Sequence, residues 1–441
     1  MIAKLSPPET VLKIARTLEK AGFETWCVGG AVRDALLGHA HLDWDLATAA
    51  RPPQIRKLFP RTVPVGVAFG TIGVLDDAGV MHEVTTFRRD VRTDGRHAEV
   101  EFGASLDEDL ARRDYTINAI AYSPSKNILA DPFHGREDLE QGIVRAVGEA
   151  NERMREDRLR ALRGLRFAAR FEFEIERETW DAIIDSAPYL SRLSAERVKQ
   201  EIEKTMDQVR KPSRAFSMWH TSGAFGTLVP ALSNMHALDL ATLDNLCPPG
   251  PKGRPQRRVM RMIALFAAAP HGEVPGILKN LRFSNSDAAW IASIVGHWQA
   301  LHKEMRFAMS ADTPPPDAAL RRWAAIAGRT RLASVLRVAS ARWAAERQAG
   351  LAAPARELVA SVYRRGIRIA YRDPIEVGDL AVNGRDLEKI GIAGPAVGQT
   401  LRSLLESVIN DPATNSRDTL LDAARRLIES KLQEDGPQHG R

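Results

Sequence analysis

The sequence has few of the features that mark disulfide-bonded, secreted or membrane proteins. Its 441 residues include only two cysteines, Cys27 and Cys247, too few for a disulfide framework or a four-thiolate zinc site. No run approaches the ~18 consecutive apolar residues of a membrane-spanning helix, and residues 1–8 lack the apolar core of a signal peptide. We therefore expect a cytoplasmic enzyme or binding protein without a membrane partner.

The net charge is small, but it is unevenly distributed along the chain. The whole sequence carries a formal charge of +6, whereas residues 251–372 hold 21 Lys and Arg against 7 Asp and Glu, a net +14. The remaining residues therefore sum to −8. The basic segment predicts a polyanionic partner for that part of the chain. The acidic remainder predicts metal or acid chemistry elsewhere. The alternative is that the arginine-rich helices are simply solvated.

Local sequence patterns predict an α/β head followed by an all-α remainder. Residues 1–137 mix strand-like and helix-like segments, and from about Leu139 onward the pattern is almost wholly helical. The expected strands of the head cover residues 25–28, 41–48, 71–75 and 80–87, and a helix is expected over 31–37. In the helical remainder we expect Trp323 and Trp343 to be core anchors.

A glycine pair follows the first expected strand and precedes the first expected helix of that unit. Glycines at Gly29 and Gly30 would let the backbone approach a phosphate closely, and a helix N-terminus presents free N–H groups to an anion. Arg33, one turn into the helix, could add a charged contact. A glycine pair alone, however, is more often an ordinary turn.

Two aspartates follow in the segment expected to form the next strand. Residues i and i+2 of a strand point to the same face, so Asp43 and Asp45 would converge while Trp44 points the other way. Paired carboxylates are costly unless a cation neutralises them, and oxygen ligands suit Mg²⁺. Asp-x-Asp is common in loops, but its place after a strand, glycine pair and helix favours a site for phosphoryl transfer.

This arrangement resembles the signature of the DNA polymerase β-type nucleotidyltransferase superfamily. The resemblance rests on Gly29-Gly30, a short spacer and Asp43-Trp44-Asp45. It implies a third carboxylate on a neighbouring strand, for which Glu83 is the candidate. His82 departs from the apolar residue usual at that place.

Three further blocks are similar to the class II tRNA nucleotidyltransferases, which comprise CCA-adding enzymes and bacterial poly(A) polymerases. They cover residues 109–121, 156–167 and 193–198. The resemblance implies that the first block holds ribose and phosphates, the second selects the base and the third stabilises the surrounding helices. The nucleotide-binding residues so implied are Gly29, Gly30, Arg33, Arg113, Asp114, Asp157, Arg160, Arg163 and Arg166.

The second block also has a physical interpretation of its own. On one helix, Asp157 and Arg160 would be i and i+3 and share a face, which Arg163 extends. The aspartate could accept from the exocyclic amine of C or A, and Arg160 could donate to the adjacent ring nitrogen. G and U carry a carbonyl in place of the amine and would leave buried groups unsatisfied. The alternative is an ordinary surface ion pair.

The resemblance also implies the organisation and activity of the whole chain. It predicts a catalytic head (1–137), a nucleotide-selecting neck (138–205), a tRNA-binding body (206–372) and a tRNA-binding tail (373–441). The loop at 88–102 resembles the family's flexible loop.

The expected activity is Mg²⁺-dependent addition of CCA to tRNA from CTP and ATP, with Asp43, Asp45 and Glu83 catalytic and Asp43 and Asp45 binding metal. The partner is the acceptor arm and elbow of tRNA, and no obligate protein partner is expected. A poly(A) polymerase, a partial CC- or A-adding enzyme and a noncatalytic RNA-binding protein remain alternatives.

Overall fold

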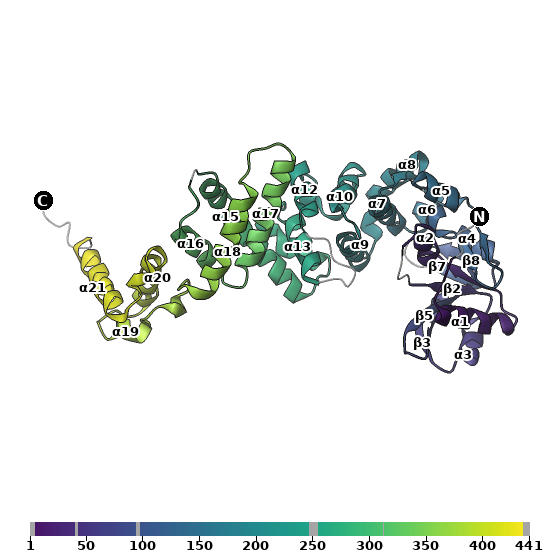
Figure 1. The fold of residues 1–441 in the computed structure, drawn as a ribbon, viewed down its shortest axis with the longest axis horizontal. Helices are drawn as coiled ribbons and strands as arrows, with labels where there is room; N and C mark the ends of the chain where they lie inside the picture. The colour runs from purple at the N-terminus through teal and green to yellow at the C-terminus, as the bar shows by residue number, and fades with distance from the viewer. Residues whose placement is uncertain (1–4, 40–42, 94–97, 247–254, 312, 435–441) are drawn as a thin grey trace. The chain divides into compact units, whose positions relative to one another are not determined.

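The computed structural model of the chain describes residues 5–39, 43–93, 98–246, 255–311 and 313–434. The chain divides into two compact units, Met1–Asn234 and Met235–Arg441. The first contains a mixed sheet with helices and the second is helical (Figure 1). This confirms the predicted fold class, while the finer division into head, neck, body and tail stays a prediction.

A seven-stranded mixed sheet forms the centre of the first unit. Its strands lie in the order β3-β4-β5-β2-β1-β8-β9, and β2 is parallel to β5 but antiparallel to β1. The strands are β1 (Thr25–Val28), β2 (Asp45–Thr48), β3 (Thr62–Gly66), β4 (Thr71–Leu75), β5 (Met81–Thr86), β8 (Ala121–Ser123) and β9 (Ile128–Ala130). Because β2 is the central strand, its first residue, Asp45, lies between the neighbouring strands β1 and β5.

Helices and a hairpin complete the head part of this unit. The helices are α1 (Glu9–Lys20), α2 (Gly30–Leu36), α3 (Pro52–Leu58), α4 (Leu106–Ala111) and α5 (Gly135–Gln141). In α1 the buried residues Val11, Ile14, Ala15 and Leu18 recur at helical spacing. A separate antiparallel hairpin joins β6 (Arg88–Thr93) to β7 (Ala98–Phe102), and residues 94–97 of the predicted flexible loop lie outside the described residues.

The strand expected over residues 41–48 is shorter in the structure, where it covers only Asp45–Thr48. β2 begins at Asp45, so Asp43 and Trp44 precede the strand, and residues 41 and 42 lie outside the described part. Trp44 is buried whereas Asp43 is exposed. Asp45 therefore begins the strand and Asp43 lies just outside it, so the predicted strand starts later than expected.

Six further helices complete the first unit. They are α6 (Ala150–Glu156), α7 (Leu159–Phe171), α8 (Arg177–Ser186), α9 (Ala195–Gln208), α10 (Pro212–Thr221) and α11 (Ala224–Leu228). Strand β10 (Ile143–Val144) precedes α6 in the chain and β11 (Glu174–Ile175) follows α7, and the two form a short parallel pair. Helix α7 buries most of its surface and packs against both α9 and α10.

The second unit is a succession of packed helices. They are α12 (Ala237–Asp244), α13 (Pro255–Phe266), α14 (Val274–Asn280), α15 (Asn285–Met309), α16 (Asp317–Ala327), α17 (Leu332–Gln348), α18 (Arg356–Arg372), α19 (Gly384–Glu388), α20 (Pro395–Asn410) and α21 (Arg417–Glu434). Trp323 and Trp343 are buried, which confirms that they are core anchors. Within the described residues no helix combines the length and apolar character needed to cross a bilayer.

Part of the arginine excess in this unit stabilises its own packing. Within the described residues, five arginines of the basic segment form ion pairs with carboxylates on other helices or loops: Arg306–Glu346, Arg321–Asp373, Arg329–Asp379, Arg342–Asp239 and Arg365–Asp317. Others, including Arg337, Arg364 and Arg368, are exposed. The exposed arginines are available for the polyanion contact that the charge distribution predicts.

Candidate active site

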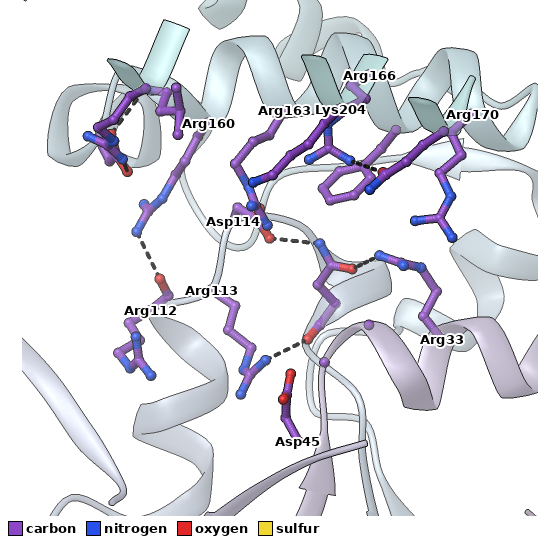
Figure 2. Close-up of a pocket in the computed structure, with 18 residues that line it drawn as sticks. Arg33, Asp45, Arg112, Arg113, Asp114, Arg160, Arg163, Arg166, Arg170 and Lys204 are labelled. Atoms are coloured by element: carbon purple, nitrogen blue, oxygen red, sulfur yellow. Dashed lines mark hydrogen bonds and ion pairs between the residues drawn. The ribbon is translucent and has the colours of Figure 1, made fainter. Parts of the chain in front are cut away.

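A cavity of about 500 Å³ in the first unit collects most of the predicted site residues (Figure 2). Its charged lining consists of nine cations and three carboxylates. They are Arg33, Arg112, Arg113, Arg160, Arg163, Arg166, Arg170, Arg197 and Lys204, with Asp45, Asp114 and Asp157. This excess of positive charge suits a compact polyanion such as a nucleoside triphosphate.

The turn between β1 and α2 forms one edge of the cavity. Gly29 has φ of +74°, a conformation that favours glycine. A Cβ at this position would lie 2.9 Å from Nη1 of Arg113, so a side chain would displace the guanidinium. Gly30 begins α2 and also lines the cavity. The predicted phosphate turn therefore lies at the cavity edge, where both glycines contribute to the lining.

The three predicted carboxylates meet where β2 and β5 run side by side. Leu46 pairs with Val84 in this parallel register, which places Asp45 beside Glu83. Burial first, and then the negative charges of Glu83 and Asp43, raise the pKa of Asp45 to about 7, while Arg113 opposes the shift. Asp45 lines the cavity, whereas Asp43 and Glu83 are exposed and lie outside its lining.

This carboxylate group fits a divalent cation that is shared with a substrate. No set of three His, Cys, Asp or Glu in the described ranges forms a complete metal cage by itself. Mg²⁺, however, is typically held by one or two carboxylates, waters and substrate phosphates. Burial is the main cause of the raised pKa of Asp45, and the negative charges of Glu83 and Asp43 add a repulsion that a bound cation would offset. The donor chemistry of Asp43 and Asp45 is therefore suitable.

A continuous polar chain forms the wall opposite Asp45. Nε of Arg163 donates to Asp114 at 2.6 Å, Nδ2 of Asn118 donates to the same carboxylate at 2.9 Å, and Nη1 of Arg33 donates to Oδ1 of Asn118 at 2.5 Å. Burial acts to raise the pKa of Asp114, but the charge of Arg163 and the Asn118 hydrogen bond outweigh it and hold the pKa at about 2. The guanidinium of Arg33 also lies 4.6 Å from the ring centroid of Phe171. These contacts fix the cationic groups before a ligand binds.

Asp157 and Arg160 line the same cavity, but not as neighbours on one helix. Helix α6 ends at Glu156, and Asp157 is extended, with φ of −148°. Its Oδ1 accepts from the backbone N–H of Leu159 at 3.0 Å and its Oδ2 accepts from Arg197 at 2.6 Å, whereas Arg160 pairs with Glu156 at 2.6 Å. The aspartate satisfies a backbone donor at the start of α7, which competes with helix continuation. The expected shared face is therefore replaced by two separately anchored groups.

Arg113 and Arg166 contact the cavity but are also held by protein carboxylates. Arg113 pairs with Asp109 at 3.2 Å. Nε of Arg166 donates to Glu201 at 2.7 Å, and its guanidinium lies 4.5 Å from the ring centroid of Phe167. The position of Arg166 is thus set by a buried ion pair between α7 and α9 as well as by the cavity.

Several lining residues were absent from the sequence-based prediction. They are Arg112, Asn118, Leu159, Phe167, Arg170, Arg197, Lys204 and Gln208. Arg170 could have been found from the sequence. It lies seven residues after Arg163 on the same helix, which is about two turns, so the two side chains share one face. Arg197 belongs to the block at 193–198, whereas Lys204 and Gln208 enter the cavity only through the packing of α9 on α7.

Family comparisons match two parts of the first unit. The family described as "Poly A polymerase head domain" matches residues 25–145, and the one described as "Probable RNA and SrmB- binding site of polymerase A" matches residues 172–235. The CCA-adding enzyme of Lactiplantibacillus plantarum is 32% identical over 430 residues, which are 95% of this chain and 96% of that protein. The CCA-adding enzyme of Streptococcus mutans is 48% identical over 200 residues, 45% of this chain and only about half, 49%, of its own length.

Solved structures with a similar fold cover nearly the whole chain. The CCA-adding enzyme of Bacillus stearothermophilus in complex with CTP has a TM-score of 0.71 and 31% identity, and the match covers 97% of this chain and 100% of that one. The Thermotoga maritima CCA-adding enzyme complexed with tRNA has a TM-score of 0.66, covers 96% and 97% of the two chains, and at 19% identity supports the fold alone.

Proposed function

The chain belongs to the family of CCA-adding enzymes, and on that premise we propose that it adds C, C and A to the 3′ end of tRNA, using CTP and ATP and releasing pyrophosphate. Family membership follows from a relative that aligns with nearly all of both chains. The observation that carries the proposed activity is the cavity whose lining combines nine cations with Asp45. We place the reaction in the cytoplasm, where tRNA and nucleoside triphosphates occur together.

In this proposal the incoming nucleotide binds with its triphosphate against the glycine turn. The backbone at Gly29 and Gly30 approaches the phosphates, and Arg33 and Arg113 neutralise them. Asp114 would lie near the ribose hydroxyls, held in its ionised form by Arg163. Because the cations are already fixed by protein contacts, little reorganisation is needed when negative charge develops on the departing pyrophosphate.

Asp43 and Asp45 are the residues that would hold a divalent metal, which enzymes of this family generally use, and we propose Mg²⁺. When bound, the ion would neutralise phosphate charge and favour the ionised 3′ hydroxyl of the tRNA. Glu83, beside Asp45 in the sheet, is the third carboxylate of this group. The sheet fixes Asp45 and Glu83 at one strand spacing, which keeps the negative charge concentrated at the reacting end of the cavity.

Base selection is assigned to Asp157 and Arg160 at the other end of the lining. Each is anchored by a protein partner, Asp157 by Arg197 and Arg160 by Glu156, so their donor and acceptor directions are set in advance. C and A both offer an amine to the carboxylate, whereas G and U offer a carbonyl. An unsatisfied buried partner costs about 1–3 kcal/mol, or roughly 5- to 150-fold in selection for each group.

The activity is tested with tRNA truncated at its 3′ end, supplied with each nucleotide alone and in combination, followed by sequencing of the products. Addition of C, C and then A supports the proposal, whereas products that stop at CC, or that gain A alone or an A tract, support the partial enzymes or a poly(A) polymerase. We expect Asp43→Ala to abolish incorporation while tRNA binding is retained. Asp185→Asn, at an exposed carboxylate of α8, is the matched control.

Base selection is tested separately with Asp157→Ala. We expect this variant to lose discrimination between CTP and UTP more than it loses tRNA affinity, because the carboxylate contacts the base and not the tRNA body. Equal discrimination by the variant and the parent would remove Asp157 from the selecting site without affecting the assignment of the overall reaction.

A further inference from the structure

One face of the sheet beside the carboxylates is apolar and open. Val63 pairs with Gly73, and Gly73 pairs with Glu83, so these three positions lie in register across β3, β4 and β5. Side chains at directly paired positions share a face. The exposed face of these strands is therefore the face that carries Glu83, and its other members are mainly apolar.

We call the exposed apolar group on this part of the sheet the β3–β5 patch. It consists of Val63, Val65, Val67, Phe69 and Met81. The side chains of Val65 and Met81 are 44% and 41% exposed, and they lean over Gly73, where a Cβ would lie 2.6 Å from the Met81 sulfur and 3.0 Å from Cγ2 of Val65. The absence of a side chain at Gly73 thus lets them form one continuous surface.

A short 3-10 turn, η1 (Val67–Phe69), follows β3 directly and carries the two remaining exposed apolar residues of the patch. Phe69 is 46% exposed. Arg88 donates from Nη1 to the Phe69 carbonyl at 2.5 Å, and its guanidinium lies 5.6 Å from the centroid of the ring. An accessible aromatic ring next to a guanidinium is the combination that binds a nucleobase by stacking and its phosphate by charge.

The patch and the nucleotide cavity lie on opposite sides of Asp45. Apart from Asp45, the residues that the sheet region contributes to the cavity follow β1 or precede β8, and the other lining residues come from α7, α9 and the segment before α7. Glu83 and the patch belong to β5, β4 and β3, on the other side of β2. In phosphoryl transfer the attacking and leaving oxygens are roughly in line. With the triphosphate in the cavity, the attacking 3′ hydroxyl must therefore approach Asp45 from the side of Glu83.

We propose that the β3–β5 patch is the surface on which the last nucleotides of the tRNA acceptor strand stack as the 3′ hydroxyl reaches Asp45. The proposal rests on the proposed function and identifies where its nucleic-acid substrate lies. Three strand spacings of about 4.8 Å separate β2 from β3, or about 14 Å. A stacked strand rises about 3.4 Å per nucleotide, so the patch spans the final four or so nucleotides.

The test compares Phe69→Ala with Phe69→Trp in the full chain. We expect Phe69→Ala to raise the KM for tRNA lacking CCA roughly tenfold, the loss of one stacked base, while the KM for CTP stays within twofold. Phe69→Trp should restore the parental KM for tRNA because the larger ring still stacks. Ile128→Ala is the matched control, since Ile128 is an exposed apolar residue, 44% accessible, on β9 at the other edge of the same sheet.

A parental KM for tRNA in Phe69→Ala would overturn the proposal. So would an equal rise in Ile128→Ala, or a rise for CTP that matches the rise for tRNA. A parent that sediments as a dimer and a Phe69→Ala variant that sediments as a monomer would instead assign the patch to a second copy of the chain.

Filter binding separates this proposal from the proposed function. Intact tRNA is compared with tRNA lacking its last four nucleotides, in the parent and in Phe69→Ala. The patch predicts that the parent favours the intact strand and that the variant loses this preference. This result does not depend on catalysis, so a parent that binds in this way but adds no nucleotide would overturn the activity alone, and a variant that keeps the preference would overturn the patch.

Discussion

The buried ion pair between Arg166 and Glu201 gives a quantitative test of how helix α7, which lines the cavity, is held. The side chains are 4% and 1% exposed, and Nε of Arg166 lies 2.7 Å from Oε2 of Glu201. Lys204 also approaches Glu201 at 3.4 Å, and Gln208 accepts from Arg166 at 3.1 Å. Replacing Glu201 by glutamine keeps the shape but removes the negative charge that balances the buried guanidinium.

Breaking one side of a buried pair typically costs about 3–5 kcal/mol, because the remaining charge has no partner. In a unit of this size each kcal/mol lowers Tm by about 2–4 °C, so Glu201→Gln should lower Tm by about 6–20 °C. The measurement is thermal unfolding of the full chain followed by circular dichroism. The double variant Arg166→Met/Glu201→Leu should recover most of the loss, since well-packed apolar residues can replace a buried pair at little cost.

Asp181→Asn provides the control. Its partner Arg177 lies 3.9 Å away, and the two side chains are 63% and 94% exposed, so no measurable shift in Tm is expected. A Glu201→Gln variant as stable as this control, or a double variant no more stable than the single one, would refute the view that the buried charge pair fixes α7 to α9.

Three further predictions concern the same unit. Gly164→Ala should lower stability by about 1–3 kcal/mol in thermal unfolding, because a Cβ would overlap the Tyr115 hydroxyl, whereas Gly276→Ala, in open space on α14, should not. Asp114 has a pKa of about 2 when folded and about 3.9 when unfolded, so it contributes about 2–3 kcal/mol that is present above pH 4 and lost as the pH falls towards 2. The Tm difference between the parent and Asp114→Asn should therefore be present at neutral pH and shrink as the pH falls from 4 towards 2, and a difference that stays constant over that range would contradict the pair. Burial raises the pKa of Cys27 to about 12, so peptide mass spectrometry should find this residue unmodified after iodoacetamide treatment of the folded protein at pH 8.

The sequence allowed much of the head to be predicted because its signals are local. The strand at 25–28, the helix after Gly30 and the strand at 71–75 depend on alternation, on turn residues and on where glycine can adopt positive φ. The two tryptophans of the helical remainder were correctly expected in the core because large aromatic side chains favour burial. Arg33 and Arg163 face the cavity because helical spacing fixes their direction once the helices form.

The features that the sequence did not predict depend on contacts between distant segments. Asp157 lies outside the helix expected to contain it, because its carboxylate binds the N–H of Leu159 and the guanidinium of Arg197, a residue 40 positions away. Arg166 faces the cavity but is engaged by Glu201, which no local pattern connects to it. Lys204 reaches the cavity only because α9 packs on α7.

The position of a strand in the sheet also determines how often that strand opens locally, and β2 lies at the centre. The strand is bonded on one side to β1 and on the other to β5, so freeing Asp45 requires two ladders to open together. Such openings need free energies close to that of global unfolding and are correspondingly rare. Edge strand β3 is bonded on one side only, so its local openings are far more frequent. Asp45 therefore lies on a strand that opens rarely, whereas β3, three strands away at the edge of the same sheet, is free to open by itself.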